Sequence, residues 1–139
     1  MKEKTPGHKN PVITVDGIVL VDGRIVLVRR GRKPEKGKLA LPGGIVEYGE
    51  TVEEAIVREV REETGLDTKI IELMGVYSDP KRDPRGHFIT LVYHLQKEGG
   101  ELRPGDDAAD VGLYELGDRS LMAFDHERIV ADFLLRRKR

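Results

Sequence analysis

The sequence contains no cysteine and no tryptophan, and aromatic residues make up only 5% of its 139 residues. Without cysteine the protein can form no disulfide, no zinc–thiolate centre and no thiol nucleophile. It also lacks an apolar run long enough to span a membrane, and its first ten residues do not resemble a signal peptide. We therefore expect a cytoplasmic protein that does not enter the membrane.

The charged residues are numerous and unevenly placed. The formal net charge is only −1, which gives no reason to expect a nucleic-acid partner. Residues 29–38, RRGRKPEKGK, are strongly basic, whereas residues 47–63 are rich in glutamate. A basic segment close to a carboxylate cluster suits an anionic, metal-bound ligand such as a phosphate ester. The alternative is a solvated basic loop.

The order of secondary structure can be read from the apolar patterns and the turn residues. Segments rich in β-branched residues predict strands at Val12–Val21, Arg24–Arg29, Leu39–Leu41, Ile45–Val46, Asp67–Tyr77, His87–Leu95 and Val111–Leu116. The Asp22-Gly23 pair between the first two strands predicts a β-hairpin. Loops are expected at Lys33–Lys38, Ser78–Gly86 and Glu98–Asp107, where proline, glycine or charged residues gather.

Two helices complete the predicted fold. The first begins at Thr51, where Thr51 and Glu54 fit a capping box, and ends at Gly65. The second runs from Ser120 to the C-terminus, most clearly from Asp125. This order predicts an α/β protein in which a mixed sheet lies between helical layers. We expect residues 1–11 to be a flexible leader and residues 12–139 to form a single domain.

Three glutamates of the first helix, Glu59, Glu62 and Glu63, are spaced so that they converge on one patch. At about 100° per residue, Glu63 falls beside the apolar stripe of the helix. Clustered, partly buried carboxylates repel one another and are costly to ionise. A divalent cation removes both penalties, and carboxylate oxygens suit Mg²⁺ or Mn²⁺. The alternative is an acidic helix face exposed to solvent.

This stretch also resembles a known motif. The Nudix box is Gly, five residues, Glu, seven residues, Arg-Glu, a bulky aliphatic residue, any residue, Glu-Glu, any residue, Gly and a bulky aliphatic residue. The chain matches it with Gly44, Glu50, Arg58-Glu59, Val60, Arg61, Glu62-Glu63, Thr64 and Gly65-Leu66. The chain therefore resembles a Nudix hydrolase, which implies an α/β/α sandwich and hydrolysis of a nucleoside diphosphate linked to another moiety.

The resemblance also implies roles for individual residues. Glu59, Glu62 and Glu63 would bind the divalent metal, together with the backbone carbonyl of Gly44. Glu50 and Arg58 would support these ligands from behind. An acid on the loop before the last strand would complete the metal site or act as general base.

Asp107 matches that acid best, with Asp106 as the alternative. Glu59 or Glu62 could serve as the base instead. A turn formed by the two aspartates, without a catalytic role, is also open.

The loop at 78–86 narrows the expected substrate. Ser78-Asp79-Pro80 and the following Arg-Asp-Pro-Arg-Gly run resemble the loop after the box in ADP-ribose pyrophosphatases. Two prolines would stiffen this loop, and Arg82 and Arg85 could form forked hydrogen bonds to phosphate or ribose oxygens. The predicted substrate contacts are Ser78, Pro80, Arg82 and Arg85. In the alternative, the loop is a rigid turn whose aspartates and arginines pair with one another.

Other parts of the substrate site are less specific. Arg29 and Arg30, at the end of a strand, could bind phosphate or face solvent. Without tryptophan, stacking on adenine would fall to Tyr77, Phe88 or Phe124.

These observations predict a Mg²⁺-dependent enzyme, with Mn²⁺ as the alternative metal, that hydrolyses ADP-ribose to AMP and ribose 5-phosphate. We expect a homodimer to whose interface the leader could contribute. Two other functions are open: hydrolysis of nucleoside triphosphates, including oxidised ones, and a non-catalytic ADP-ribose sensor.

Overall fold

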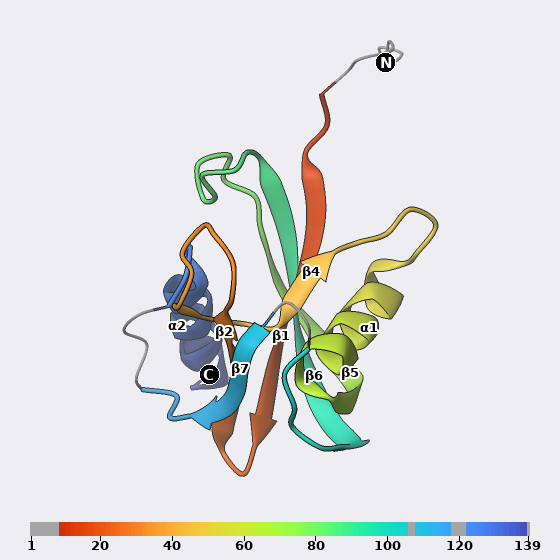
Figure 1. The fold of residues 1–139 in the computed structure, drawn as a ribbon, viewed down its shortest axis with the longest axis vertical. Helices are drawn as coiled ribbons and strands as arrows, with labels where there is room; N and C mark the ends of the chain where they lie inside the picture. Colours follow the sequence, from red (N-terminus) through yellow and green to blue (C-terminus); the bar gives the residue numbers. More distant parts are fainter. Residues whose placement is uncertain (1–8, 106–107, 118–121, 139) are drawn as a thin grey trace.

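The computed structural model describes residues 9–105, 108–117 and 122–138, which form a seven-stranded sheet and two helices. Figure 1 shows the sheet with α1 and α2 on either side of it. The elements are β1 (Val12–Val21), β2 (Arg24–Arg30), β3 (Leu39–Ala40), β4 (Gly43–Ile45), α1 (Val52–Thr64), β5 (Leu66–Tyr77), β6 (Phe88–Gly100), β7 (Ala108–Tyr114) and α2 (His126–Arg137).

The sheet is mixed. Its main strand order is β3-β2-β1-β6-β5, with β4 also paired to β1 and β7 to β2. The central strands β1 and β6 run parallel, and the other pairs are antiparallel. The α/β/α sandwich with a mixed sheet, predicted from the sequence, is confirmed.

Alternation along the strands places one core on each face of the sheet. Val15 and Val19 of β1 pack with Ile56 of α1. Ile18, between them on the opposite face, packs with Phe133 of α2. Both helices are amphipathic, so each buries one apolar stripe on the sheet and leaves its polar face outside.

The turn and the helix ends that depend only on neighbouring residues were predicted correctly. Asp22 and Gly23 both have positive φ, 52° and 77°, as a two-residue hairpin of type I′ requires. The Thr51–Glu54 capping box is present, and Gly65 ends α1 with φ 80°.

Elements whose limits depend on distant partners were predicted less well. Strand β6 continues to Gly100 rather than Leu95, because its last residues pair with the start of β5. The prediction that a loop begins at Glu98 was therefore wrong. Strand β7 is Ala108–Tyr114 rather than Val111–Leu116, and β4 is Gly43–Ile45 rather than Ile45–Val46.

The last helix also begins later than predicted, at His126. Phe124 has φ 53°, and Met122 forms a β-bridge with Leu39 of β3, so the residues just before the helix pair with the sheet. The predicted start, Ser120, lies outside the described residues. Within the described ranges, neither helix has the length and apolar character needed to cross a membrane.

Candidate active site

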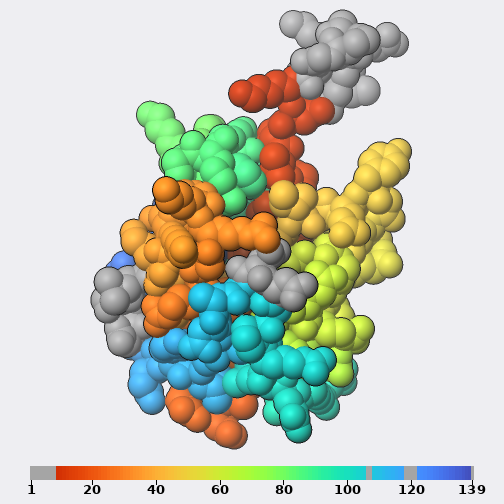
Figure 2. Space-filling view, in the orientation of Figure 1, coloured from red at the N-terminus to blue at the C-terminus, as the bar shows by residue number. Residues whose placement is uncertain are grey.

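A cleft of about 950 Å³ opens between α1 and the basic segment after β2. Figure 2 shows this segment (orange) and α1 (yellow-green) on opposite sides of the face. The cleft is lined on one side by Arg29, Arg30, Arg32 and Lys33, and on the other by Glu47, Glu59, Glu62 and Glu63. The two charged segments are close together in the sequence, and the fold brings them to face each other across the cleft.

Arg58 organises the acidic side. Its guanidinium donates to both carboxylate oxygens of Glu50, at 2.7 and 2.9 Å, and to Glu59 Oε1 at 2.7 Å. The hydrogen bonds from Arg58 lower the pKa of Glu50 to about 2, and the same contacts raise the pKa of Arg58. Arg58 and Glu50 thus hold Glu59 from behind, as the resemblance implied.

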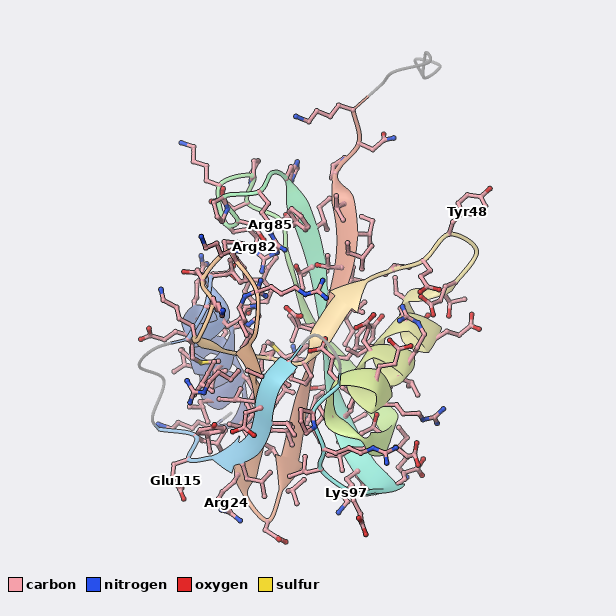
Figure 3. All side chains as sticks on the ribbon, in the orientation of Figure 1. Arg24, Tyr48, Arg82, Arg85, Lys97 and Glu115 are labelled. Carbon is pink, nitrogen blue, oxygen red and sulfur yellow. The ribbon has the colours of Figure 1, made fainter. Side chains whose placement is uncertain are left out.

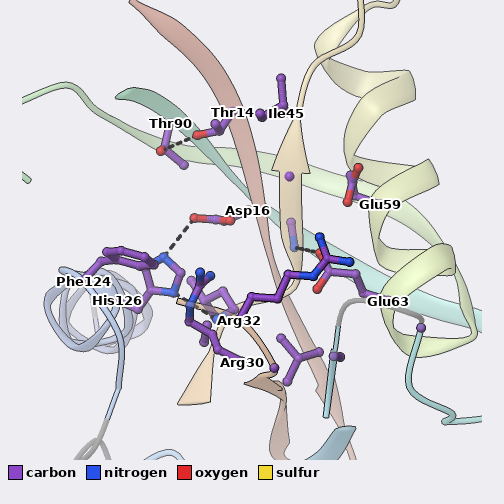
Figure 4. Close-up of a pocket in the computed structure, with 18 of the residues that line it drawn as sticks. Thr14, Asp16, Arg30, Arg32, Ile45, Glu59, Glu63, Thr90, Phe124 and His126 are labelled. Atoms are coloured by element: carbon purple, nitrogen blue, oxygen red, sulfur yellow. Dashed lines mark hydrogen bonds and ion pairs between the residues drawn. The ribbon is translucent and has the colours of Figure 1, made fainter. Parts of the chain in front are cut away.

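Glu59 and Glu63 point into the cleft from the inner side of α1 (Figure 4). Burial raises the pKa of Glu59. It also raises the pKa of Glu63 to about 8, with further contributions from the negative charges of Glu59 and Asp16. The hydrogen bond that Gly43 N donates to Glu63 Oε1, at 3.2 Å, opposes this shift. Burial and the negative charge of neighbouring carboxylates therefore make both Glu59 and Glu63 harder to ionise.

Two glycines allow the backbone to approach these acids. A Cβ on Gly44 would lie 2.4 Å from Glu59 Oε2, and a Cβ on Gly43 would lie 2.2 Å from Asp16 Oδ1. Any side chain at either position would displace a carboxylate or the strand. The Gly44 backbone therefore lies directly against Glu59, as a combined backbone and carboxylate site for a hard cation requires.

The metal site is nevertheless not assembled from side chains alone. Among the described residues, no three acidic or histidine side chains converge as a group that could hold one ion. The side chain of Glu62 is 59% exposed and lies 3.3 Å from Arg58. The residues still fit a hard divalent cation, because the partly buried carboxylates of Glu59 and Glu63 lie close together beside a glycine backbone. The metal site remains a prediction.

The basic side of the cleft is built around an aromatic ring. The guanidinium of Arg30 lies 4.8 Å from the ring centre of Phe124, and that of Arg85 lies 5.1 Å from the same ring. Burial and the nearby charge of Arg85 lower the pKa of Arg30. Arg85 also lies 4.9 Å from the ring of Phe88. Arg30 and Arg85 repel each other, so an anion would bind favourably between them. The adjacent aromatic ring could stack on a planar group attached to that anion.

The two arginines of the 78–86 loop, which are labelled in Figure 3, differ sharply in their exposure and their partners. Arg82 is 7% exposed and donates to both carboxylate oxygens of Asp125 at 2.7 Å, and also to Thr90. Each nitrogen of its guanidinium therefore already donates to a protein acceptor. Arg85 is 45% exposed and pairs with Asp83, as the alternative interpretation of this loop predicted.

The remaining predicted residues are placed as follows. Ser78 and Pro80 are exposed and are not part of the cleft lining. Arg29 lines the cleft, and its NH1 donates to Gly37 O at 2.7 Å. Asp107 and its alternative Asp106 lie outside the described residues. Of the three aromatic candidates, Phe88 and Phe124 line the cleft, whereas the Tyr77 hydroxyl donates to Asp132 at 2.8 Å.

The cleft residues that the sequence did not predict include Asp16 and His126. Both are buried, and Asp16 Oδ2 lies 3.3 Å from His126 Nε2. The available signal was an acid inside the apolar run that was predicted, and is observed, to form β1.

The raised pKa of Glu63 predicts a pH dependence of stability in metal-free buffer. A carboxyl group whose pKa is higher in the folded than in the unfolded protein reduces stability as pH rises from about 4.3 towards the folded value of about 8. Glu63→Gln should therefore be more stable than the wild type at pH 8, by on the order of 2–4 kcal/mol, and equally stable near pH 4. Urea unfolding at both pH values in EDTA measures the difference. A constant difference between pH 4 and pH 8 would show that Glu63 is not the titrating group.

Comparison with known proteins gives a consistent result. The NUDIX domain model matches residues 11–133. The chain is 53% identical over 127 residues to a protein of Methanocaldococcus jannaschii named ADP-ribose pyrophosphatase, covering 91% of this chain and 75% of that protein.

Two solved structures are also similar. The NUDIX domain of Shewanella oneidensis NrtR, complexed with ADP ribose, matches with TM-score 0.85 and 26% identity over 96% of this chain and 93% of that one. A bifunctional NMN adenylyltransferase/ADP ribose pyrophosphatase of Francisella tularensis, complexed with AMP and a Mn ion, matches with TM-score 0.81 and 31% identity. It covers 94% of this chain, which spans only 43% of that larger protein.

Proposed function

Because the chain belongs to the NUDIX family, we propose that it hydrolyses the diphosphate of ADP-ribose to AMP and ribose 5-phosphate with a divalent metal. One observation carries this proposal: a single cleft sets the partly buried Glu59 and Glu63 opposite Arg30 and Arg85, beside the Phe124 ring. A diphosphate could lie between the two charged sides while a base stacks on the aromatic surface. The relative named ADP-ribose pyrophosphatase supports the choice of substrate.

The acidic side would hold Mg²⁺, or Mn²⁺, through Glu59, Glu62, Glu63 and the Gly44 carbonyl. Such an ion, when bound, offsets charge on phosphate oxygens and lowers the pKa of water. The Mn ion bound with AMP in the Francisella relative supports a divalent metal. Glu62 would have to leave Arg58 to take part, since the two side chains are paired at 3.3 Å.

In this proposal, different side chains of the cleft position the metal ligands, bind the phosphates and stack on the base. Arg58 keeps Glu59 ionised and oriented. Arg29, Arg30 and Arg85 bind the phosphates and so fix the diphosphate opposite the glutamates. Phe124 or Phe88 stacks on the base.

A carboxylate then takes the proton from the attacking water. We assign this step to Asp107, with Asp106, Glu59 and Glu62 as alternatives. Arg82 is given a supporting role, because its hydrogen-bonding groups are directed to Asp125 and Thr90.

Initial rates with Mg²⁺ and a panel of substrates test the choice of substrate. We expect kcat/KM for ADP-ribose to exceed that for each nucleoside triphosphate, normal or oxidised. Preferred release of pyrophosphate from a triphosphate would instead support the alternative hydrolase. Tight binding of ADP-ribose without turnover would support the sensor.

We also propose a homodimer, on the basis of an uncovered sheet face. Helix α1 has 13 residues and is about 20 Å long, whereas β6 has 13 residues and is about 40 Å long. The strands therefore extend beyond α1 (Figure 1). Leu73 and Val76 of the edge strand β5 lie on this face, 44% and 54% exposed, with Ile13 of β1 at 38%. A second copy of the same face would cover these side chains.

Light scattering should therefore give the mass of a dimer for the wild type and of a monomer for Val76→Lys. Lys69→Ala, a change at an exposed position on the same strand, should remain dimeric. A monomeric wild type would rule out this interface. The cytoplasmic location and the absence of a nucleic-acid partner, expected from the sequence, remain predictions.

A further inference from the structure

His126, the first residue of α2, contacts both the backbone between β3 and β4 and a side chain of β1. Its side chain is buried, and its Nδ1 accepts a hydrogen bond from Leu41 N at 3.0 Å. A backbone N–H can only donate, so Nδ1 carries no proton and the ring proton is on Nε2. Nε2 lies 3.3 Å from Asp16 Oδ2 (Figure 4). Nδ1 therefore connects α2 to the Leu41 backbone, and Nε2 connects it to Asp16 of β1.

Asp16 continues this contact towards the acidic side of the cleft. The residue is 8% exposed and lies against Gly43, where a Cβ would come within 2.2 Å of Asp16 Oδ1. The N–H of Gly43 donates to Glu63 Oε1 at 3.2 Å. His126 and Glu63 thus lie on opposite sides of the same short backbone segment, with Asp16 packed against its middle.

The segment Leu41–Gly44 is held at each residue. Leu41 N–H is fixed by His126, and Pro42 O accepts from Gly17 N at 2.8 Å. Gly43 is fixed by Glu63, and Gly44 lies against the Glu59 carboxylate. A small displacement of this segment would therefore move the contacts of both Glu59 and Glu63.

We infer that Asp16 and His126 form a positioning pair that sets the Leu41–Gly44 segment, and through it Glu59, Glu63 and the Gly44 carbonyl, for binding of a divalent cation. This inference rests on the proposed function, because it takes those groups to be the cation site. The pair contacts neither the diphosphate nor the cation. Residues that orient metal ligands in this way typically change affinity by about 10- to 100-fold when they are replaced.

The affinity of the substrate-free protein for Mn²⁺, measured by electron paramagnetic resonance, tests the pair. His126→Ala should weaken Mn²⁺ binding about 10-fold or more. His126→Asn places an amide oxygen near the position of Nδ1 and should restore most of the affinity by accepting from Leu41. The matched control is His94→Asn, because His94 packs against Phe133 and is not part of the cleft lining. It should bind Mn²⁺ as the wild type does.

Nitrogen-15 NMR of wild-type His126 gives a second test that needs no variant. We expect a protonated Nε2 and an unprotonated Nδ1, as the hydrogen bond from Leu41 N requires. A protonated Nδ1 would overturn the pair even if His126→Ala failed to fold.

The outcomes separate this inference from the proposed function. Wild-type Mn²⁺ affinity in folded His126→Ala would overturn the positioning pair alone. Mn²⁺ binding without hydrolysis of ADP-ribose would overturn the proposed function alone. A wild-type protein that binds no Mn²⁺ would overturn both.

Discussion

Glu63→Gln and Glu59→Gln are each expected to lower kcat for ADP-ribose about 1,000-fold with Mg²⁺ present. Each substitution keeps the size of the side chain but removes a negative charge from the proposed cation site. The loss corresponds to several kcal/mol of charge stabilisation that a bound metal supplies. Steady-state rates, together with circular dichroism and thermal unfolding, separate this effect from misfolding.

A control on the same helix makes the test specific. Glu53 is exposed and lies in the first turn of α1, so Glu53→Gln removes the same charge without touching the cleft. It should keep wild-type kcat. If Glu63→Gln or Glu59→Gln retained near-wild-type turnover, the assignment of these residues to the metal would be wrong.

Arg82→Leu is expected to destabilise the protein by about 3 kcal/mol or more. The substitution leaves the carboxylate of Asp125, which is 19% exposed, without its two hydrogen bonds from Arg82. It also releases the 78–86 loop from the start of α2. Urea unfolding in metal-free buffer measures this loss.

Arg85→Leu provides the comparison, because the two arginines belong to one short motif. Arg85 is 45% exposed, and Asp83 would keep the hydrogen bond that it accepts from the backbone N–H of residue 85, so the loss of stability should be smaller than for Arg82→Leu. Its guanidinium faces the cleft, however, and KM for ADP-ribose should rise. If Arg82→Leu raised KM without loss of stability, Arg82 would contact the substrate after all.

The sequence was most informative where structure depends on near neighbours. Helix α1 could be placed because Thr51, Glu54 and Gly65 act within a turn of each helix end. The spacing of Glu59 and Glu63 likewise follows from helix geometry alone. Every specified position of the Nudix box that contains them is matched, so the sequence alone was enough to indicate the family.

Features that depend on distant contacts could not be predicted. The residues next to Arg82 and Arg85 do not distinguish the two side chains. They differ because Asp125, distant in the sequence, pairs with Arg82. The contact of Asp16 could not be predicted, because its partner His126 lies near the other end of the sequence. The length of β6 was missed for the same reason, because its final residues are ordered by pairing with β5.

Analysis of the products of ADP-ribose hydrolysis tests the central claim most directly. With Mg²⁺, the protein should release AMP and ribose 5-phosphate in equal amounts, and EDTA should abolish the reaction until Mg²⁺ or Mn²⁺ is restored. Any other pair of products, or turnover that persists in EDTA, would contradict the proposed function.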